Sequence, residues 1–335
     1  MNTSFLFNLS IMVLFLCNKA AGFVSPSSYL TRMTFLVGGA QDDYHVHSKS
    51  LSQWVTFSHP SKTSLKRDMQ TTSDGIYIVH SMPEPLPPKL KHDYFLLRHG
   101  QSTGNVEGVI SSARSLATST KHGLTPLGMD QGTEAAGRFL ALLEQQVQKN
   151  GDCMLKLPNK RVFFYSSPFA RAKQTAEACL NALLTKEEHI VQSQQLNLDI
   201  QKDIRIEDGL MERFFGELDD KPLATYAYVW PEDQLDVTQT GTYNVESVAA
   251  VATRAREVIM KIEESQVHSE EGDVIVLTSH ADVCQIIQLY ASGIENVGDF
   301  SSYRFANGEV RYMGRSVDTL PERQPLEMPG VLPKV

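Results

Sequence analysis

Two histidines in this sequence each come one to three residues after the end of a short apolar run. His99 follows the run 94–97 and its neighbour Arg98, and His280 comes soon after the run 274–277. An imidazole just beyond a strand can donate one ring nitrogen to the backbone, which fixes the tautomer and leaves the other nitrogen facing a substrate. His99 is therefore a candidate nucleophile for phosphoryl transfer, with Arg98 beside it to hydrogen-bond phosphate oxygens.

An arginine also stands where a helix start would normally disfavour it. Ser167 and Pro168 look like a helix cap and a first helical residue, which places Arg171 in the first turn. Cations are disfavoured near a helix N-terminus, so Arg171 is better explained as a clamp for an anion. Further candidates for phosphate binding near these motifs are Ser102, Asn105, Ser111, Ser112 and Ala281.

Glu212 is the candidate general acid. It lies between the apolar pairs 210–211 and 214–215. Loss of water around a carboxyl group raises its pKa and lets it hold a proton for a leaving alkoxide. Glu207 and Asp208 are alternatives for the same role.

The elements that must position these residues follow from the hydrophobic pattern. Short, unalternating apolar runs are typical of strands buried on both faces, and longer helical patterns lie between them. The sequence predicts an α/β three-layer sandwich with a mostly parallel central sheet and helices on both faces, in which ligands bind beyond the carboxyl ends of the strands. The predicted strands are 94–97, 162–165 and 274–277, and the predicted helices are 126–142, 170–184, 247–264 and 282–291.

The order of these motifs resembles the histidine phosphatase superfamily, also called phosphoglycerate-mutase-like. The matching segments are Arg98 to Asn105, Leu124 to Gly128, Ser166 to Ala176, Glu212 to Gly216, Glu246 with Ser247, and Ser279 with His280. The resemblance implies that His99 accepts the phosphoryl group, that Arg98, Arg171 and His280 stabilise its charge, and that Glu212 donates the proton. It implies no metal and no cofactor.

Departures from the family pattern favour the phosphatase-type branch over the mutases. The mutase substrate loop Arg-Phe-Thr-Gly-Trp-x-Asp is missing, and 108–113 reads Gly-Val-Ile-Ser-Ser-Ala in its place. Phe215 stands where mutases carry Tyr, and Ala281 replaces the Gly that commonly follows the last His. We therefore expect a phosphomonoesterase; a mutase and a phosphate-binding pseudoenzyme are the alternatives. The segment 222–243, with three aromatic residues, is expected to cover the pocket.

Composition limits the partners. The 335 residues carry a formal net charge of -8, which argues against a general nucleic-acid or anionic-membrane surface. The cysteines form no disulfide framework, because an odd number remains after the apolar leader, and no metal-binding spacing is present. We expect the partner to be a small-molecule phosphomonoester.

The N-terminal region predicts targeting rather than fold. The apolar run 5–17 is shorter than a membrane-spanning helix needs, so 1–22 is predicted to be a signal-peptide-like leader. Residues 23–88 are predicted to be a transit-peptide-like region and linker that ends in a proline-rich stretch, 89–315 the catalytic domain, and 316–335 a loosely packed tail. The leader resembles the bipartite signals that direct proteins to secondary plastids. Secretion and a signal anchor are the alternatives, and no stable membrane association is expected once the leader is removed.

Overall fold

The computed structural model describes residues 70–71, 77–149, 160–190, 198–268 and 272–326. Its centre is a five-stranded sheet in the order β5-β4-β6-β3-β7, in which β7 runs antiparallel to β3 and the other pairs are parallel. The strands are β3 (Asp93–Arg98), β4 (Lys160–Ser166), β5 (Leu198–Ile206), β6 (Val274–Ser279) and β7 (Val310–Tyr312). A separate antiparallel pair is formed by β1 (Gln70–Thr71) and β2 (Tyr77–Ile78).

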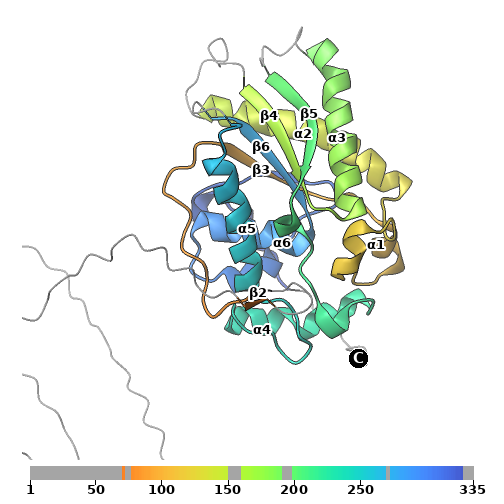
Figure 1. The fold of residues 1–335 in the computed structure, drawn as a ribbon, viewed down its shortest axis with the longest axis vertical. Coiled ribbons are helices and arrows are strands. Elements are labelled where there is room, and N and C mark those ends of the chain that lie inside the picture. Colours follow the sequence, from red (N-terminus) through yellow and green to blue (C-terminus); the bar gives the residue numbers. More distant parts are fainter. Residues whose placement is uncertain (1–69, 72–76, 150–159, 191–197, 269–271, 327–335) are drawn as a thin grey trace, which may run out of the picture. The chain divides into compact units, whose positions relative to one another are not determined.

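Helices connect the strands and cover the sheet (Figure 1). The α-helices are α1 (Thr103–Glu107), α2 (Pro126–Lys149), α3 (Ala170–Ile190), α4 (Trp230–Leu235), α5 (Val248–Glu264) and α6 (Ala281–Ser292). Short 3-10 helices are η2 (Arg114–Thr118), η4 (Asp208–Leu210), η5 (Gly216–Leu218), η6 (Leu223–Tyr228), η7 (Val297–Ser302) and η8 (Val317–Thr319).

Both faces of the sheet are buried, as the unalternating apolar runs predict. Along β3, Tyr94 and Leu96 pack into one hydrophobic cluster with residues of α5 and α6. Phe95 and Leu97 pack into a second cluster with residues of α2 and α3. Side chains of a strand point alternately to its two faces, so these clusters lie on opposite sides of the sheet. This confirms the predicted three-layer α/β sandwich with a mostly parallel sheet.

The predicted helices are confirmed, with one correction at a helix start. α2 begins at Pro126 as predicted, and the hydroxyl of Thr125 accepts a hydrogen bond from the amide of Gly128 at 3.1 Å. α3 begins at Ala170, so Pro168 is not its first residue. The hydroxyl of Ser167, predicted to cap α3, instead lies 2.9 Å from Nε2 of His280.

The proline-rich stretch before residue 89, predicted to be a linker, packs against the folded part. Leu86 is 4% exposed and lies in the cluster formed with α5 and α6. Nε of Arg256 donates to the carbonyl of Glu84 at 2.9 Å, and Arg315 donates to that of Pro87 at 2.9 Å. The packed fold therefore begins before residue 89. The predicted leader 1–22 and most of the region 23–88 lie outside the described residues and stay predictions.

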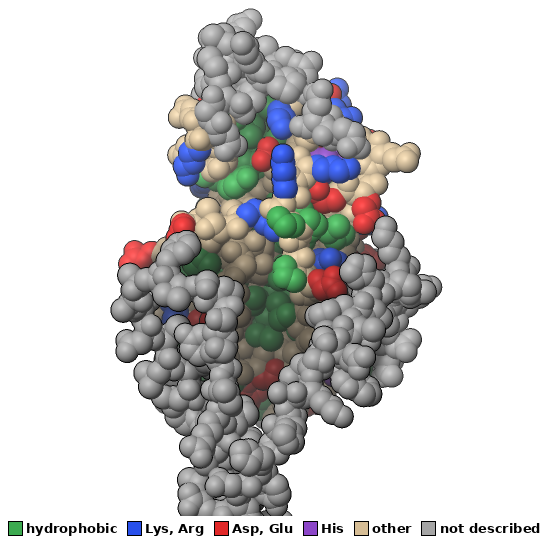
Figure 2. Space-filling model, turned by 90° about the vertical axis from the view of Figure 1, so that its left-hand side faces the viewer, with side chains coloured by type: hydrophobic (Ala, Val, Ile, Leu, Met, Phe, Trp, Pro, Cys, Tyr) green, Lys and Arg blue, Asp and Glu red, His purple; other side chains and the backbone are tan. Residues whose placement is uncertain are grey.

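The first part of the predicted tail is also in contact with the fold. Leu320 packs against the cluster on the α5 and α6 side, and the amide of Gln324 donates to the carbonyl of Ser302 at 2.8 Å. No helix in the described ranges is long and apolar enough to cross a membrane. On the face shown in Figure 2, Lys and Arg side chains lie among acidic and apolar ones rather than in one patch.

Candidate active site

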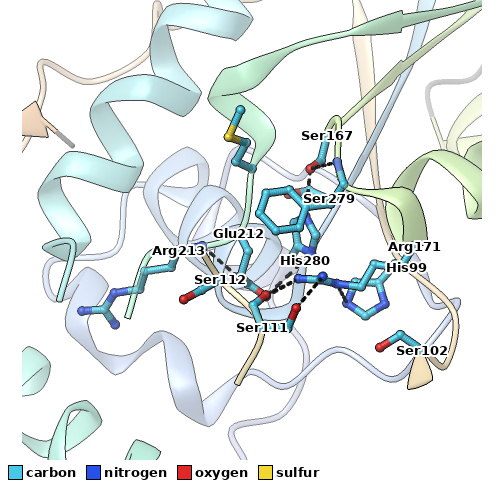
Figure 3. A network of polar contacts seen from close by, with 12 residues as sticks. His99, Ser102, Ser111, Ser112, Ser167, Arg171, Glu212, Arg213, Ser279 and His280 are labelled. Carbon is cyan, nitrogen blue, oxygen red and sulfur yellow. Dashed lines mark hydrogen bonds and ion pairs between the residues drawn. The ribbon is translucent and has the colours of Figure 1, made fainter. Parts of the chain in front are cut away.

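The two histidines meet because they follow neighbouring parallel strands. His99 comes directly after β3 and His280 directly after β6, and the amide of His99 donates to the carbonyl of Ser279 at 3.0 Å. Parallel strands end at the same edge of a sheet, so the two rings lie with their centroids 5.1 Å apart. Figure 3 shows both rings beside Arg171 and Glu212.

The surroundings of His99 define its reactive nitrogen. Nδ1 donates to the carbonyl of Gly100 at 2.7 Å, so the lone pair of the neutral ring lies on Nε2. Burial, then Arg171 and Arg98, hold the pKa of His99 well below its usual value. The backbone passes close to α2 at this point, and a Cβ added to Gly100 would lie 2.3 Å from the carbonyl oxygen of Gly128. His99 is thus a neutral, fixed imidazole that lines the pocket and whose Nε2 accepts a hydrogen bond from Nε of Arg171.

Two guanidinium groups flank His99. Nε of Arg171 lies 3.2 Å from Nε2 of His99, and its terminal nitrogens donate to the carbonyl of Ser111 at 2.8 Å and to the hydroxyl of Ser111 at 3.3 Å. Arg98 donates to the carbonyl of Phe305, and its Nε is buried without a hydrogen-bond partner in the described chain. Such groups bind phosphate oxygens with strong, charge-assisted hydrogen bonds.

His280 lies beside His99, in edge-to-face contact with its ring, and is not among the residues that line the pocket. It is fully buried, and burial, then Arg171, hold its pKa well below the usual value, so the ring is neutral. The hydroxyl of Ser167 accepts from the amide of Phe169 at 3.3 Å and can donate to Nε2 of His280, which leaves the ring proton on Nδ1. Nδ1 is buried and has no hydrogen-bond partner among the described residues. A phosphate oxygen would satisfy it.

Glu212 lies across the pocket from His99. Its Oε1 accepts from the amide of Arg213 at 2.9 Å, and its Oε2 lies 3.7 Å from Nδ1 of His280 and 3.9 Å from Nη2 of Arg171. Burial raises the pKa of Glu212, while Arg171 opposes the rise. A buried carboxyl group with a raised pKa can carry a proton to a leaving group.

A second layer of charge holds the Glu212 segment in place. Glu246 accepts from Nε of Arg254 at 2.8 Å, from Nη2 of Arg114 at 3.1 Å and from the amide of Phe214 at 3.1 Å. Burial alone would raise the pKa of Glu246, but Arg254 and Arg114 bring it below the usual value. Arg254 also donates to the carbonyls of Gly209 and Met211, so the backbone is held on both sides of Glu212.

The remaining predicted residues divide into two groups. Ser102, Asn105, Ser111 and Ala281 line the pocket. Ser102 also caps α1, accepting from the amide of Asn105 at 3.2 Å. Ser112 was predicted to bind phosphate, but its buried hydroxyl donates to Asp219 at 2.7 Å and accepts from the amide of Phe215 at 3.0 Å. Ser112 therefore supports the loop and does not line the pocket.

The alternatives to Glu212 are not brought to the pocket. The carboxylate of Glu207 accepts from Lys261 at 2.8 Å, and Asp208 lies in η4 outside the pocket lining. The segment predicted to cover the pocket does contribute to it, through Tyr226 and Trp230.

Several pocket residues carry no signal in the sequence strong enough to find them. Arg304 and Phe305 line the pocket from the segment after η7, where no motif marks them. Asp282 and Gln285 line it from the first two turns of α6. Their position just after His280 was the one available signal, because a helix that starts at a strand end presents its first turn to the site.

The sequence profile of the histidine phosphatase superfamily (branch 1) matches residues 94–316. The chain belongs to the histidine phosphatase superfamily. No curated protein matches the chain.

Solved structures similar to this member of the superfamily are distant in sequence. A mycobacterial glucosyl-3-phosphoglycerate phosphatase is 18% identical, with a TM-score of 0.45 over 65% of this chain and 90% of that chain. An alpha-ribazole phosphatase from Shigella flexneri is 20% identical, with a TM-score of 0.42 over 65% of this chain and 88% of that chain.

The charge of the site favours an anion over a metal ion. A nitrogen of each histidine and a carboxylate oxygen of Glu212 lie within 4.8 Å of one another, which is close enough to hold a metal. Arg98 and Arg171 lie beside them, and two guanidinium groups repel a cation and attract a phosphate dianion. The arrangement can hold a phosphoryl group between the neutral ring of His99 and the carboxyl group of Glu212, whose pKa is raised.

Proposed function

We propose that this member of the histidine phosphatase superfamily is a phosphomonoesterase that works through a phosphohistidine on His99, without a metal or cofactor. The observation that carries the proposal is the state of His99, which lines the pocket, whose Nδ1 donates to Gly100 and whose Nε2 accepts from Nε of Arg171. Burial and two arginines lower its pKa, so the nucleophile is neutral and needs no separate base.

In the first step, Nε2 of His99 attacks the phosphorus atom of a small-molecule phosphomonoester. The N–P bond forms as the ester O–P bond breaks, and the proton of Glu212 passes to the leaving oxygen. Arg98, Arg171 and Nδ1 of His280 hydrogen-bond the oxygens of the transferring group. Preorganised donors of this kind supply much of the rate in phosphoryl transfer.

In the second step, water attacks the phosphohistidine. The ionised Glu212 accepts a proton from the water as the new O–P bond forms and the N–P bond breaks. This returns neutral His99, a protonated Glu212 and inorganic phosphate. In a mutase the phosphoryl group would instead return to another hydroxyl of the same substrate.

The segment 108–113, which stands where mutases carry their substrate loop, supports hydrolysis. The carbonyl and hydroxyl of Ser111 in this segment accept hydrogen bonds from the guanidinium of Arg171. Ser112 in the same segment is bonded to Asp219. The segment therefore organises the phosphate clamp, and its hydrogen bonds are directed to the protein.

The test is phosphate release from a panel of phosphomonoesters, with isomerisation of 3-phosphoglycerate measured in parallel and His99→Ala as the control. We expect release without isomerisation, lost in His99→Ala. Isomerisation that requires a bisphosphorylated primer would replace the proposal with a mutase. Phosphate binding with neither activity would identify a pseudoenzyme.

A further inference from the structure

The pocket beyond the phosphate-binding residues has a distinct character. Its walls are mostly apolar or aromatic, with one amide, one carboxyl group and one guanidinium. The residues are Val109, Leu223, Tyr226, Trp230, Asp282, Gln285, Arg304 and Phe305. This is the space that a leaving alcohol would occupy.

Asp282 is the carboxyl group in that space. It lies in the first turn of α6, two residues after His280, and is 4% exposed. Its Oδ2 accepts a hydrogen bond from Nε1 of Trp230 at 3.3 Å. Its Oδ1 has no hydrogen-bond partner within the described part of the chain. One oxygen of a buried carboxyl group is therefore left for a ligand.

Asp282 forms one long ion pair within the described part of the protein. Nη1 of Arg213 lies 3.7 Å from Oδ2 of Asp282, beyond hydrogen-bond distance. Arg213 already forms a two-pronged ion pair with Asp233, with both nitrogen–oxygen distances 2.7 Å. Arg213 is therefore paired mainly with Asp233, and the long contact with Asp282 leaves part of the charge of Asp282 to act on the pocket.

We infer that Asp282 selects phosphomonoesters of uncharged, hydroxylated alcohols and rejects those whose leaving group carries a carboxylate or a second phosphate. The inference rests on the proposed function. Asp282 repels a like charge held against it in a buried pocket, whereas a hydroxyl can donate to its free oxygen.

Neighbouring side chains fit the same class of alcohol. The amide of Gln285 can donate to or accept from a hydroxyl. The rings of Tyr226 and Trp230 stack with centroids 4.6 Å apart at 12°, and both line the pocket. Stacked aromatic rings offer apolar contact to the carbon skeleton of a polyol. A sugar phosphate or glycerol phosphate combines these features.

The selection should depend on pH. Burial and the nearby charge of Glu212 raise the pKa of Asp282 to about 7, with Asp233 adding to the rise and Arg213 and Trp230 opposing it. Below this pKa the group is neutral and tolerates an acidic substrate, and above it the carboxylate repels one. Discrimination should therefore grow as the pH rises through about 7.

Arg304 is the group that could reverse this preference. It lines the same pocket, and its Nη2 donates to the carbonyl of Pro325 at 3.1 Å. If Arg304 governed selection, substrates with a carboxylate would be preferred. The experiment must separate the two residues.

The test compares glycerol 3-phosphate with 3-phosphoglycerate, which differ only in a CH2OH group replaced by a carboxylate. We expect kcat/KM of the wild-type protein to favour glycerol 3-phosphate by at least about tenfold at pH 8, with a smaller ratio at pH 6. Asp282→Asn should bring the ratio toward one at both pH values, mainly through a lower KM for 3-phosphoglycerate. Asp203→Asn, an exposed acid on β5, should keep the wild-type ratio.

Equal or better use of 3-phosphoglycerate by the wild-type protein would overturn the inference, and loss of that preference in Arg304→Gln would assign selection to Arg304. A ratio unchanged in Asp282→Asn would also overturn it. Hydrolysis of p-nitrophenyl phosphate reports on the proposed function by itself. If it is absent, calorimetric binding of the two compounds to the wild-type protein still decides the inference, which requires tighter binding of glycerol 3-phosphate.

Discussion

At the scale of single residues, the site depends on His99, His280 and Glu212. Burial shifts the pKa of each of these groups away from its usual value in water. His99 and His280 are neutral because burial and nearby guanidinium groups disfavour their charged forms. Burial raises the pKa of Glu212, which favours its protonated form, while Arg171 opposes the rise. In the proposed mechanism, the same loss of water prepares a nucleophile, a hydrogen-bond donor and an acid.

Removing the acid should affect substrates according to their leaving groups. Glu212→Gln keeps the shape of the side chain but cannot give up a proton, so alkyl phosphates should lose about 10²–10⁴-fold in kcat/KM. p-Nitrophenyl phosphate, whose leaving group needs little protonation, should lose far less. Steady-state kinetics over a series of leaving groups measures this. An equal loss across the series would remove Glu212 from the role of acid.

The pH profile should have two limbs with different origins. The pKa of His99 is lowered well below its usual value, so activity should fall only at acid pH, where the ring becomes protonated. The pKa of Glu212 is raised, so activity should fall again as the pH rises through it and the acid is lost. In Glu212→Gln the basic limb should disappear from the residual kcat/KM for an alkyl phosphate. If the basic limb persists in Glu212→Gln and disappears in Asp282→Asn, the limb belongs to Asp282.

At the scale of elements, the site is built where three parallel strands end and two helices begin. β3 delivers His99, β6 delivers His280, and the start of α3 delivers Arg171. The short helix α4 is joined to this framework by Asp233, which is fully buried and pairs with Arg213 next to Glu212. The helix that lines the pocket is therefore anchored to the segment that carries the acid.

Breaking this anchor should destabilise the protein. Asp233→Ala leaves the guanidinium of Arg213 buried without its partner, and we expect the free energy of unfolding to fall by about 3–5 kcal/mol. Glu232→Ala, an exposed neighbour on α4, should change it by less than about 0.5 kcal/mol. Chemical denaturation of the two variants measures the difference. Equal stability of the two would contradict the anchoring role of Asp233.

The sequence predicts those parts of the site that strand ends and helix starts fix directly. His99, Arg171 and His280 were found this way, because the elements that carry them show clear hydrophobic patterns. The sequence prediction wrongly placed Ser112 among the phosphate-binding residues. The direction of a side chain in an irregular loop follows no period, so the sequence does not show that Ser112 donates to Asp219. Arg304 was missed because only the tertiary fold brings its segment to the pocket.

At the scale of the whole molecule, the fold extends beyond the segment that carries the motifs. The superfamily match covers residues 94–316, yet Leu86 lies in the core beside α5 and α6. The prolines around Leu86 predict an extended backbone, which is typical of a linker. They act only on the local backbone, so they do not show that the side chain of Leu86 packs in the core.

The proline-rich stretch before residue 89 should therefore contribute to the stability of the fold. Leu86→Ala removes a buried side chain from the core, and we expect the free energy of unfolding to fall by about 2–5 kcal/mol. Leu235→Ala, at a side chain that is 89% exposed, is the matched control and should have little effect. Thermal and urea denaturation compare the two. A loss in Leu86→Ala no larger than in the control would show that the stretch is a linker after all.

The most direct test of the account is to trap the phosphorylated enzyme during turnover. The reaction is stopped in alkali, which preserves phosphohistidine, and the peptides are examined by mass spectrometry. We expect the phosphoryl group on Nε2 of His99, formed as fast as the enzyme turns over and absent from His99→Ala. Phosphate release without this intermediate, or a phosphoryl group on His280 instead, would contradict the assignment of His99 as the nucleophile.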